Sequence, residues 1–124
     1  MAASRGAQDK EDDEGPSAPA RNEVRLVGRL AAAAEERELP SGDRLVTWRL
    51  VVRRPPSTRK GAPTIDTIEC AAYRGDVRRA ATRWSVDDVV EVDGALRRRF
   101  WQTAAGAASR TEVEVAAARR VARA

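Results

Sequence analysis

Arginine and aromatic side chains occur together in residues 90–101, whose sequence is VEVDGALRRRFW. Apolar residues recur there at every second position, which is the period of a β-strand. The side chains predicted to face a core are Val90, Val92, Leu96 and Phe100, and those predicted to face solvent are Arg97, Arg99 and Trp101. Gly94, between the two halves, is predicted to be a bend or bulge.

The solvent-facing row combines two groups that bind a single nucleic-acid strand. Guanidinium groups pair with phosphates, and an indole offers a flat surface on which a base can stack. The same residues also fit an arginine-rich edge strand in which Trp101 lies over the rim of its own core. From this segment alone both interpretations stay open.

The residue inventory excludes several kinds of catalytic and metal site. The sequence has no histidine, which rules out Ser-His-Asp and Cys-His catalysis and any His-ligated metal. Cys70 is the single cysteine, so it forms no intrachain disulfide, and its alternating apolar surroundings predict a buried, unreactive thiol. The remaining candidate acids and bases are surface carboxylates. We therefore expect no enzymatic activity, no metal and no cofactor.

The length of 124 residues allows one domain, and a charged fraction of 34% indicates a thin core that subunit association would help to bury. No apolar run approaches membrane-spanning length, and the N-terminus lacks the apolar segment of a signal peptide. We therefore expect a cytoplasmic protein that does not contact a membrane.

Charge divides the chain into two parts. Residues 1–21 hold five acidic and three basic side chains and few large apolar ones, which predicts a disordered acidic tail. Residues 22–124 hold 20 basic against 14 acidic side chains, and nearly all of these cations are arginines. Such a domain favours polyanionic partners, although a GC-rich genome would also enrich arginine and alanine.

Apolar periodicity predicts the elements that must position these side chains. Strands are predicted at 23–30, 45–53, 64–73, 88–101 and 111–117, a helix at about 76–84, and a hairpin loop at 103–109. Gly28 is predicted to be a bulge in the first strand. By propensity alone residues 31–38 are helical, although a turn follows at once.

The predicted faces separate core from surface. Trp48 and Trp84 share faces with aliphatic residues, so both are predicted to lie in the core. The outward faces of the second to fourth strands collect Arg49, Arg53, Thr67, Tyr73, Arg97, Arg99 and Trp101. Glu69 and Glu91 lie on the same faces, where they would either repel phosphates or pair with neighbouring arginines.

Three strands, a helix and two further strands follow in the order of the OB-fold, a five-stranded, partly open Greek-key barrel. We therefore predict an all-β, five-stranded OB-fold barrel with one short helix between the third and fourth strands. Period-two patterning also fits other small barrels, and the position of the helix is what favours the OB-fold.

Four segments, in order and at nearly family spacing, resemble the bacterial single-stranded-DNA-binding protein family. The segments are NEVRLVGRL at 22–30, LPSG at 39–42, VEVDGALRRRFW at 90–101 and TEVEV at 111–115. The resemblance covers nearly all of residues 22–121, and it implies an extended conformation for residues 31–38. It also implies that Trp101 and Tyr73 stack on bases. Thr67 and Pro56 stand where members of the family carry further aromatic residues, so the stacking platform is about half-populated.

The resemblance implies binding of single-stranded DNA without sequence preference, in replication, recombination or repair, by a nucleoid-associated protein. It also implies a homotetramer, a dimer of dimers assembled through the region of the first strand. The chain stops at basic residues 118–124, so we expect no acidic C-terminal tip that recruits repair enzymes. Two alternatives stay open: a protein-interaction or structural OB domain that has lost its DNA surface, and a domain that binds single-stranded RNA.

Overall fold

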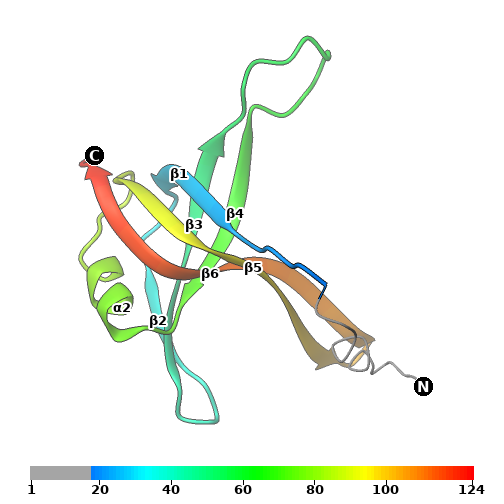
Figure 1. Ribbon diagram of the computed structural model, residues 1–124, viewed down its shortest axis with the longest axis vertical. Helices are drawn as coiled ribbons and strands as arrows, with labels where there is room; N and C mark the ends of the chain where they lie inside the picture. Colours follow the sequence, from blue (N-terminus) through cyan, green and yellow to red (C-terminus); the bar gives the residue numbers. More distant parts are fainter. Residues whose placement is uncertain (1–17) are drawn as a thin grey trace.

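Six strands and one helix follow one another along residues 18–124, the part of the chain that the computed structural model describes. Figure 1 shows their arrangement. They are β1 Val24–Leu30, β2 Glu35–Glu38, β3 Arg44–Arg53, β4 Ile65–Ala72, α2 Gly75–Ala81, β5 Val89–Thr103 and β6 Gly106–Ala122. Most of the predicted tail, residues 1–17, lies outside the described residues. No helix within residues 18–124 is long and apolar enough to cross a membrane.

Five of these strands close a ring. The sheet order runs β1-β5-β6-β4-β3, and β3 pairs back with β1 at Val51 and Leu50, opposite Arg29 and Leu30. Only the short β4–β6 contact is parallel among the described pairings. The ring and the helix between β4 and β5 confirm the predicted OB-fold. Residues 35–38 are extended, as the resemblance implied, and pair with the first half of β3.

Two tryptophans form the centre of the core. Trp48 on β3 is 4% exposed and Trp84, just after α2, is 7% exposed. Their rings meet edge to face, with centroids 5.2 Å apart and planes at 90°, a geometry that adds to the stabilisation from apolar burial. Helix α2 packs against β3 and β6, which carries Trp84 onto the barrel. Both predictions of core tryptophans are confirmed.

Cys70 on β4 is buried in the same core. Burial, together with the nearby carboxylates of Glu69 and Glu112, raises the pKa of its thiol to about 12. The thiolate is the reactive form of cysteine, so this thiol is unreactive at neutral pH, as predicted.

Two glycines permit close approach between strands. The β5–β6 register shifts between Asp93 and Gly94, which confirms the predicted bulge, and a Cβ at Gly94 would overlap the carbonyl oxygen of Glu114. The bulge predicted at Gly28 is wrong, because the β1–β5 register continues regularly through that residue. Gly28 instead lets β1 pass close to β3, where a Cβ would lie 2.6 Å from the carbonyl oxygen of Val51.

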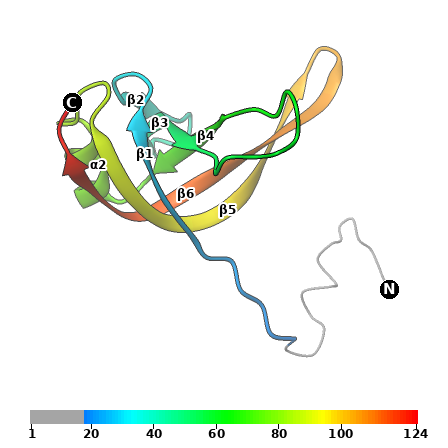
Figure 2. The same cartoon turned by 90° about the horizontal axis from the view of Figure 1, so that it is seen from above.

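From Arg97 and Glu112 onward, β5 and β6 leave the barrel together as a long two-stranded hairpin (Figure 2). Leu96 is 49% exposed and Phe100 is 72% exposed, so the prediction that they face a core is wrong. Leu96 does lie opposite the buried Val113, on the inward face of the ladder. The barrel ends before Phe100, however, and leaves this face of the hairpin uncovered. Pairing extends to Thr103 and Gly106, so the predicted loop at 103–109 is mostly strand.

The buried side chain of Asp88 ties the start of β5 to the end of β6. Its carboxylate accepts hydrogen bonds from the backbone N–H groups of Ser85 at 2.9 Å and Ala124 at 2.8 Å, and from Arg120 at 3.3 Å. These donors hold the pKa of Asp88 below its ordinary value. The carboxylate therefore contributes stability above the ordinary pKa of an aspartate, and this contribution is lost as the pH falls through the lowered one.

Replacing either core tryptophan should destabilise the domain strongly. We expect Trp48→Ala or Trp84→Ala to lower the free energy of unfolding by about 3–5 kcal/mol, because each leaves a large cavity. Urea denaturation followed by circular dichroism measures this loss. The exposed Trp101→Ala is the matched control and should cost less than about 1 kcal/mol; an equal loss in all three variants would contradict the assignment of the core.

Asp88→Asn should reduce the pH dependence of stability. The parent should lose stability as the pH falls from about 5 to 2, because protonation of Asp88 breaks its charged hydrogen bonds. The variant should be less stable than the parent at pH 7 and should show a shallower decline on acidification. Urea midpoints measured at a series of pH values test this expectation, and parallel pH curves would refute it.

Candidate nucleic-acid interface

The predicted site residues lie on the outer surface of neighbouring strands. Arg49 and Arg53 come from β3, Thr67 from β4, Tyr73 from the residue after β4, and Arg97, Arg99 and Trp101 from β5. Thr67 pairs with Val51, between the two β3 arginines, and β6 joins β4 to β5. The structure therefore places these residues on one curved surface, with Trp101 on the hairpin beyond the barrel.

Tyr73 and Arg99 are in direct contact. The Cζ atom of Arg99 lies 5.5 Å from the centroid of the half-buried Tyr73 ring, which is within the range of a cation–π interaction. The guanidinium therefore covers one face of the ring that was predicted to stack on a base.

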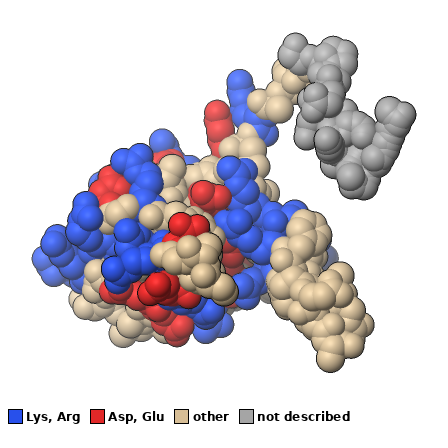
Figure 3. Space-filling model, turned by 90° about the horizontal axis from the view of Figure 1, so that it is seen from below, with Lys and Arg blue, Asp and Glu red and all other residues tan. Residues whose placement is uncertain are grey.

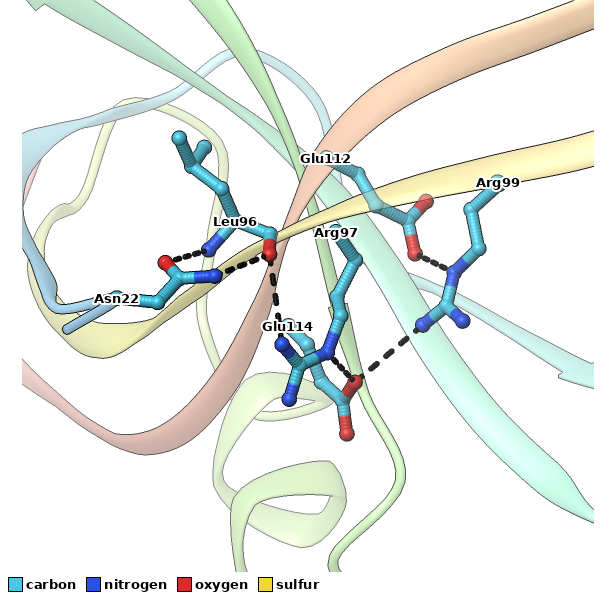
Figure 4. A network of polar contacts seen from close by, with 6 residues as sticks. All are labelled: Asn22, Leu96, Arg97, Arg99, Glu112 and Glu114. Atoms are coloured by element: carbon cyan, nitrogen blue, oxygen red, sulfur yellow. Dashed lines mark hydrogen bonds and ion pairs between the residues drawn. The ribbon is translucent and has the colours of Figure 1, made fainter. Parts of the chain in front are cut away.

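Arg99 is itself held by a buried carboxylate. Glu112 on β6 is 6% exposed, and its Oε2 accepts a hydrogen bond of 2.6 Å from Nε of Arg99 (Figure 4). This hydrogen bond raises the pKa of Arg99 above its ordinary value. Arg99 also lies 3.5 Å from Glu114, so two carboxylates fix its position beneath Tyr73.

Arg97 belongs to the same network. Its Nε donates to Glu114 at 3.1 Å, and its Nη1 lies 3.5 Å from the carbonyl oxygen of Leu96. The side-chain amide of Asn22 donates a hydrogen bond to the carbonyl oxygen of Leu96 and accepts one from its N–H group, each at 2.8 Å (Figure 4). These two bonds continue the pairing of β1 with β5 beyond the end of β1. The two arginines predicted to bind phosphate are thus brought together, and both are already paired with carboxylates.

Sequence reasoning missed Glu112 and Glu114 as partners of these arginines. Both residues alternate with the buried Val113 and Val115, so their outward direction is visible in the TEVEV segment. The missing information was the register, which places Glu112 directly opposite Arg97 across the β5–β6 ladder.

The other acidic residues of the surface also pair with arginine. Glu69 lies 3.9 Å from Arg49, and Glu91 lies 2.9 Å from Arg119. Of the two possibilities left open by the sequence, pairing is therefore the one that the structure shows. Arg53 is exposed, and no carboxylate within residues 18–124 lies at ion-pair distance from it.

Trp101 is 44% exposed and stands apart from the buried core cluster. The exposed Arg110 of β6 lies over its ring, with Cζ 5.7 Å from the ring centroid. In the described part of the chain, Arg110 has no carboxylate at ion-pair distance. The hairpin thus offers an indole and an unneutralised guanidinium side by side, and Arg110 is a further site residue that sequence reasoning missed.

The described residues hold no group of three His, Cys, Asp or Glu side chains arranged to bind a metal ion. What the surface offers is stacking and ion pairing. Basic side chains cover much of the body in Figure 3, and the uncharged tip of the hairpin projects from it. Both features suit a flexible polyanion that carries planar groups.

Comparison with known proteins decides the family. The sequence model of the single-strand binding protein family matches residues 21–122. The chain belongs to this family. Its relatives include Single-stranded DNA-binding protein 1 of Staphylococcus aureus (strain COL), 33% identical over 85 residues, which are 68% of this chain and 51% of the relative. The Single-stranded DNA-binding protein of Thermotoga maritima is 34% identical over 89 residues, and the match covers 68% of this chain and 62% of that relative.

This single-strand binding family member spans about half the length of the Staphylococcus relative that it matches. Among solved structures it is similar to the Plasmodium falciparum SSB in complex with ssDNA, with a TM-score of 0.69 and 19% identity. That match covers 84% of this chain and 96% of the other. At this identity the likeness concerns the fold alone.

Arg99 and Arg97 should differ in their effect on stability. Arg99→Ala leaves Glu112 buried without its cation, and we expect a loss of about 1–3 kcal/mol in the free energy of unfolding. Arg97→Ala breaks a half-exposed pair and should cost less than about 1 kcal/mol. Urea denaturation measures both losses.

The double variant Arg99→Ala/Glu112→Gln is the control, because it removes the buried charge together with its partner. It should recover part of the stability lost in Arg99→Ala. An equal free energy of unfolding for Arg99→Ala and Arg97→Ala would show that the buried Glu112–Arg99 pair contributes no more to stability than the half-exposed pair of Arg97.

Proposed function

We propose that this protein binds single-stranded DNA without sequence preference, by stacking bases on Trp101 and Tyr73 and by pairing phosphates with arginines. The observation that carries the proposal is the exposed Trp101 with Arg110 beside it, on a barrel of the single-strand binding protein family. The proposal is also supported by relatives named as single-stranded DNA-binding proteins. Binding of this kind acts in replication, recombination and repair wherever single strands are exposed.

The arginines divide into two roles under this proposal. Arg53 and Arg110 have no carboxylate at ion-pair distance in the described residues, so they are ready to contact phosphates. Arg49 and Arg97 exchange half-exposed carboxylates for phosphates when the strand binds. Arg99 is a positioning residue, because Glu112 fixes its guanidinium against Tyr73.

The strand crosses the barrel between Arg53 and the hairpin. Thr67 lies on this path and offers a hydroxyl and a small surface in place of a stacking ring. Because base stacking contributes about 1–3 kcal/mol per base, a path with two aromatic platforms binds each strand moderately, and association of several chains on one strand increases the total affinity.

The assembly we propose is a homotetramer, a dimer of dimers joined through β1, in a nucleoid-associated cytoplasmic protein. The outer face of β1 carries the half-exposed Val27. Two ion pairs flank it, Arg25 with Asp93 at 2.6 Å and Arg29 with Asp87 at 3.1 Å. An apolar centre with a charged rim is typical of protein interfaces.

Val27→Asp should dissociate the assembly, because it places a carboxylate at the centre of that interface without disturbing the core. Light scattering should give a fourfold chain mass for the parent and a smaller mass for the variant. A parent that is monomeric, or a variant with the mass of the parent, would contradict assembly through β1.

Fluorescence anisotropy with labelled oligothymidine, measured at several salt concentrations, tests the proposed function. The logarithm of the affinity should fall linearly with the logarithm of the salt concentration, by about 0.7 for each phosphate neutralised. Trp101→Ala should weaken binding by about 1–3 kcal/mol for one stacked base and leave the slope unchanged. Arg110→Ala should instead reduce the slope.

Arg83→Ala is the matched control, because this exposed arginine follows α2 rather than lying on the proposed surface. It should bind nearly as the parent does. Parent-like binding by Trp101→Ala would reject the stacking site, and tighter binding of oligouridine than of oligothymidine would identify RNA as the ligand.

A further inference from the structure

The β5–β6 hairpin has a second aromatic face that the proposed site does not use. Phe100 and Trp101 are consecutive in β5, so their side chains leave opposite faces of the strand. Phe100 is 72% exposed, and the guanidinium of Arg98 lies over its ring, with Cζ 5.8 Å from the centroid. An aromatic ring with an arginine beside it therefore occurs on each face of the hairpin.

The charge on this second face is unneutralised. Residues 96–111 contain four arginines and no acidic residue, and of these arginines Arg98 lies on the face of Phe100 while the other three share the face of Trp101. On the face of Trp101, Arg97 and Arg99 are paired with glutamates. On the opposite face Arg98 donates a hydrogen bond of 2.6 Å to the neutral hydroxyl of Ser109, and no carboxylate of residues 18–124 lies at ion-pair distance from it. The charge of Arg98 is therefore available to pair with a phosphate beside Phe100.

From Arg97 on β5 through the turn to Glu112 on β6, neither edge of the hairpin pairs with another described strand. Asn22 is the last described contact of the β1 side with β5, at Leu96. On the other side, β4 pairs with β6 at Val113 and Glu114. A flexible strand can therefore pass around an edge of this ribbon and contact both faces, whereas a rigid folded partner would cover only one.

We propose that a single DNA strand bound at Trp101 continues around the edge of the hairpin and stacks a second base on Phe100. Arg98 pairs with a phosphate next to that base. This inference rests on the proposed function and adds to it a second contact on the inward face of the ladder. A strand bound in this way contacts both faces of the hairpin. Long strands, which reach both faces, therefore bind more tightly than they would through contacts on the barrel alone.

The experiment compares Phe100→Leu, which keeps apolar bulk and removes the flat ring, with Phe100→Trp, which enlarges the ring. Each variant is titrated with a labelled oligothymidine of about 35 nucleotides, longer than the site of a single OB-fold, and with one of about 5 nucleotides. Trp101→Leu is measured in parallel. Urea midpoints establish that all variants are folded, and light scattering gives their mass.

Phe100→Leu should bind the long oligonucleotide about 5- to 150-fold more weakly than the parent does. It should bind the short one, which occupies the Trp101 face alone, as the parent does. Phe100→Trp should bind the long one at least as tightly as the parent.

Parent-like binding of the long oligonucleotide by Phe100→Leu, together with weakened binding by Trp101→Leu, overturns this inference and leaves the proposed function standing. A reduced mass for Phe100→Leu would show that a second copy of the chain covers Phe100, which also overturns it. Failure of the parent to bind either oligonucleotide, or parent-like binding by Trp101→Leu, rejects the proposed function itself.

Discussion

The antiparallel pairing of β5 with β6 is the interaction on which the rest of the structure depends. Its first half forms a wall of the barrel, where Val90, Val92 and Val115 are buried. Past the bulge at Gly94 the same ladder continues to the turn after Thr103, and from Arg97 and Glu112 onward it is a free hairpin. The pairing of β5 with β6, shifted in register at that bulge, thus connects the hydrophobic core to Trp101 and fixes the face of the hairpin from which its side chain projects.

Most arginines on the surface form ion pairs with carboxylates of the same chain. The antiparallel register places carboxylates on neighbouring strands close to these arginines, as with Glu112 and Arg99. Such pairs hold the long side chains in fixed positions. The positioned guanidinium of Arg99 supports Tyr73, whereas Arg53 and Arg110 keep their full charge for a ligand. Net charge alone therefore overstates the number of phosphates that this surface can bind.

Periodicity predicted the strands of the barrel and the two core tryptophans, because these depend on local spacing of apolar residues, whereas the position of the helix favoured the OB-fold and the glycine itself indicated the bulge at Gly94. Periodicity failed for Leu96 and Phe100, since alternation shows which face a residue occupies but not where the barrel that covers that face ends. It also failed for Gly28, whose role depends on the approach of β1 to β3, two strands that are distant in sequence. Ion-pair partners were missed for the same reason, because they depend on register.

The most direct test of the central claim uses tryptophan fluorescence, since Trp48 and Trp84 are buried and Trp101 is exposed. Single-stranded DNA should quench the fluorescence of the parent by stacking on Trp101. Trp101→Phe keeps a flat ring, so it should still bind the strand by anisotropy while the quenching disappears. Quenching that persists undiminished in this folded, DNA-binding variant would contradict the placement of Trp101 at the centre of the site.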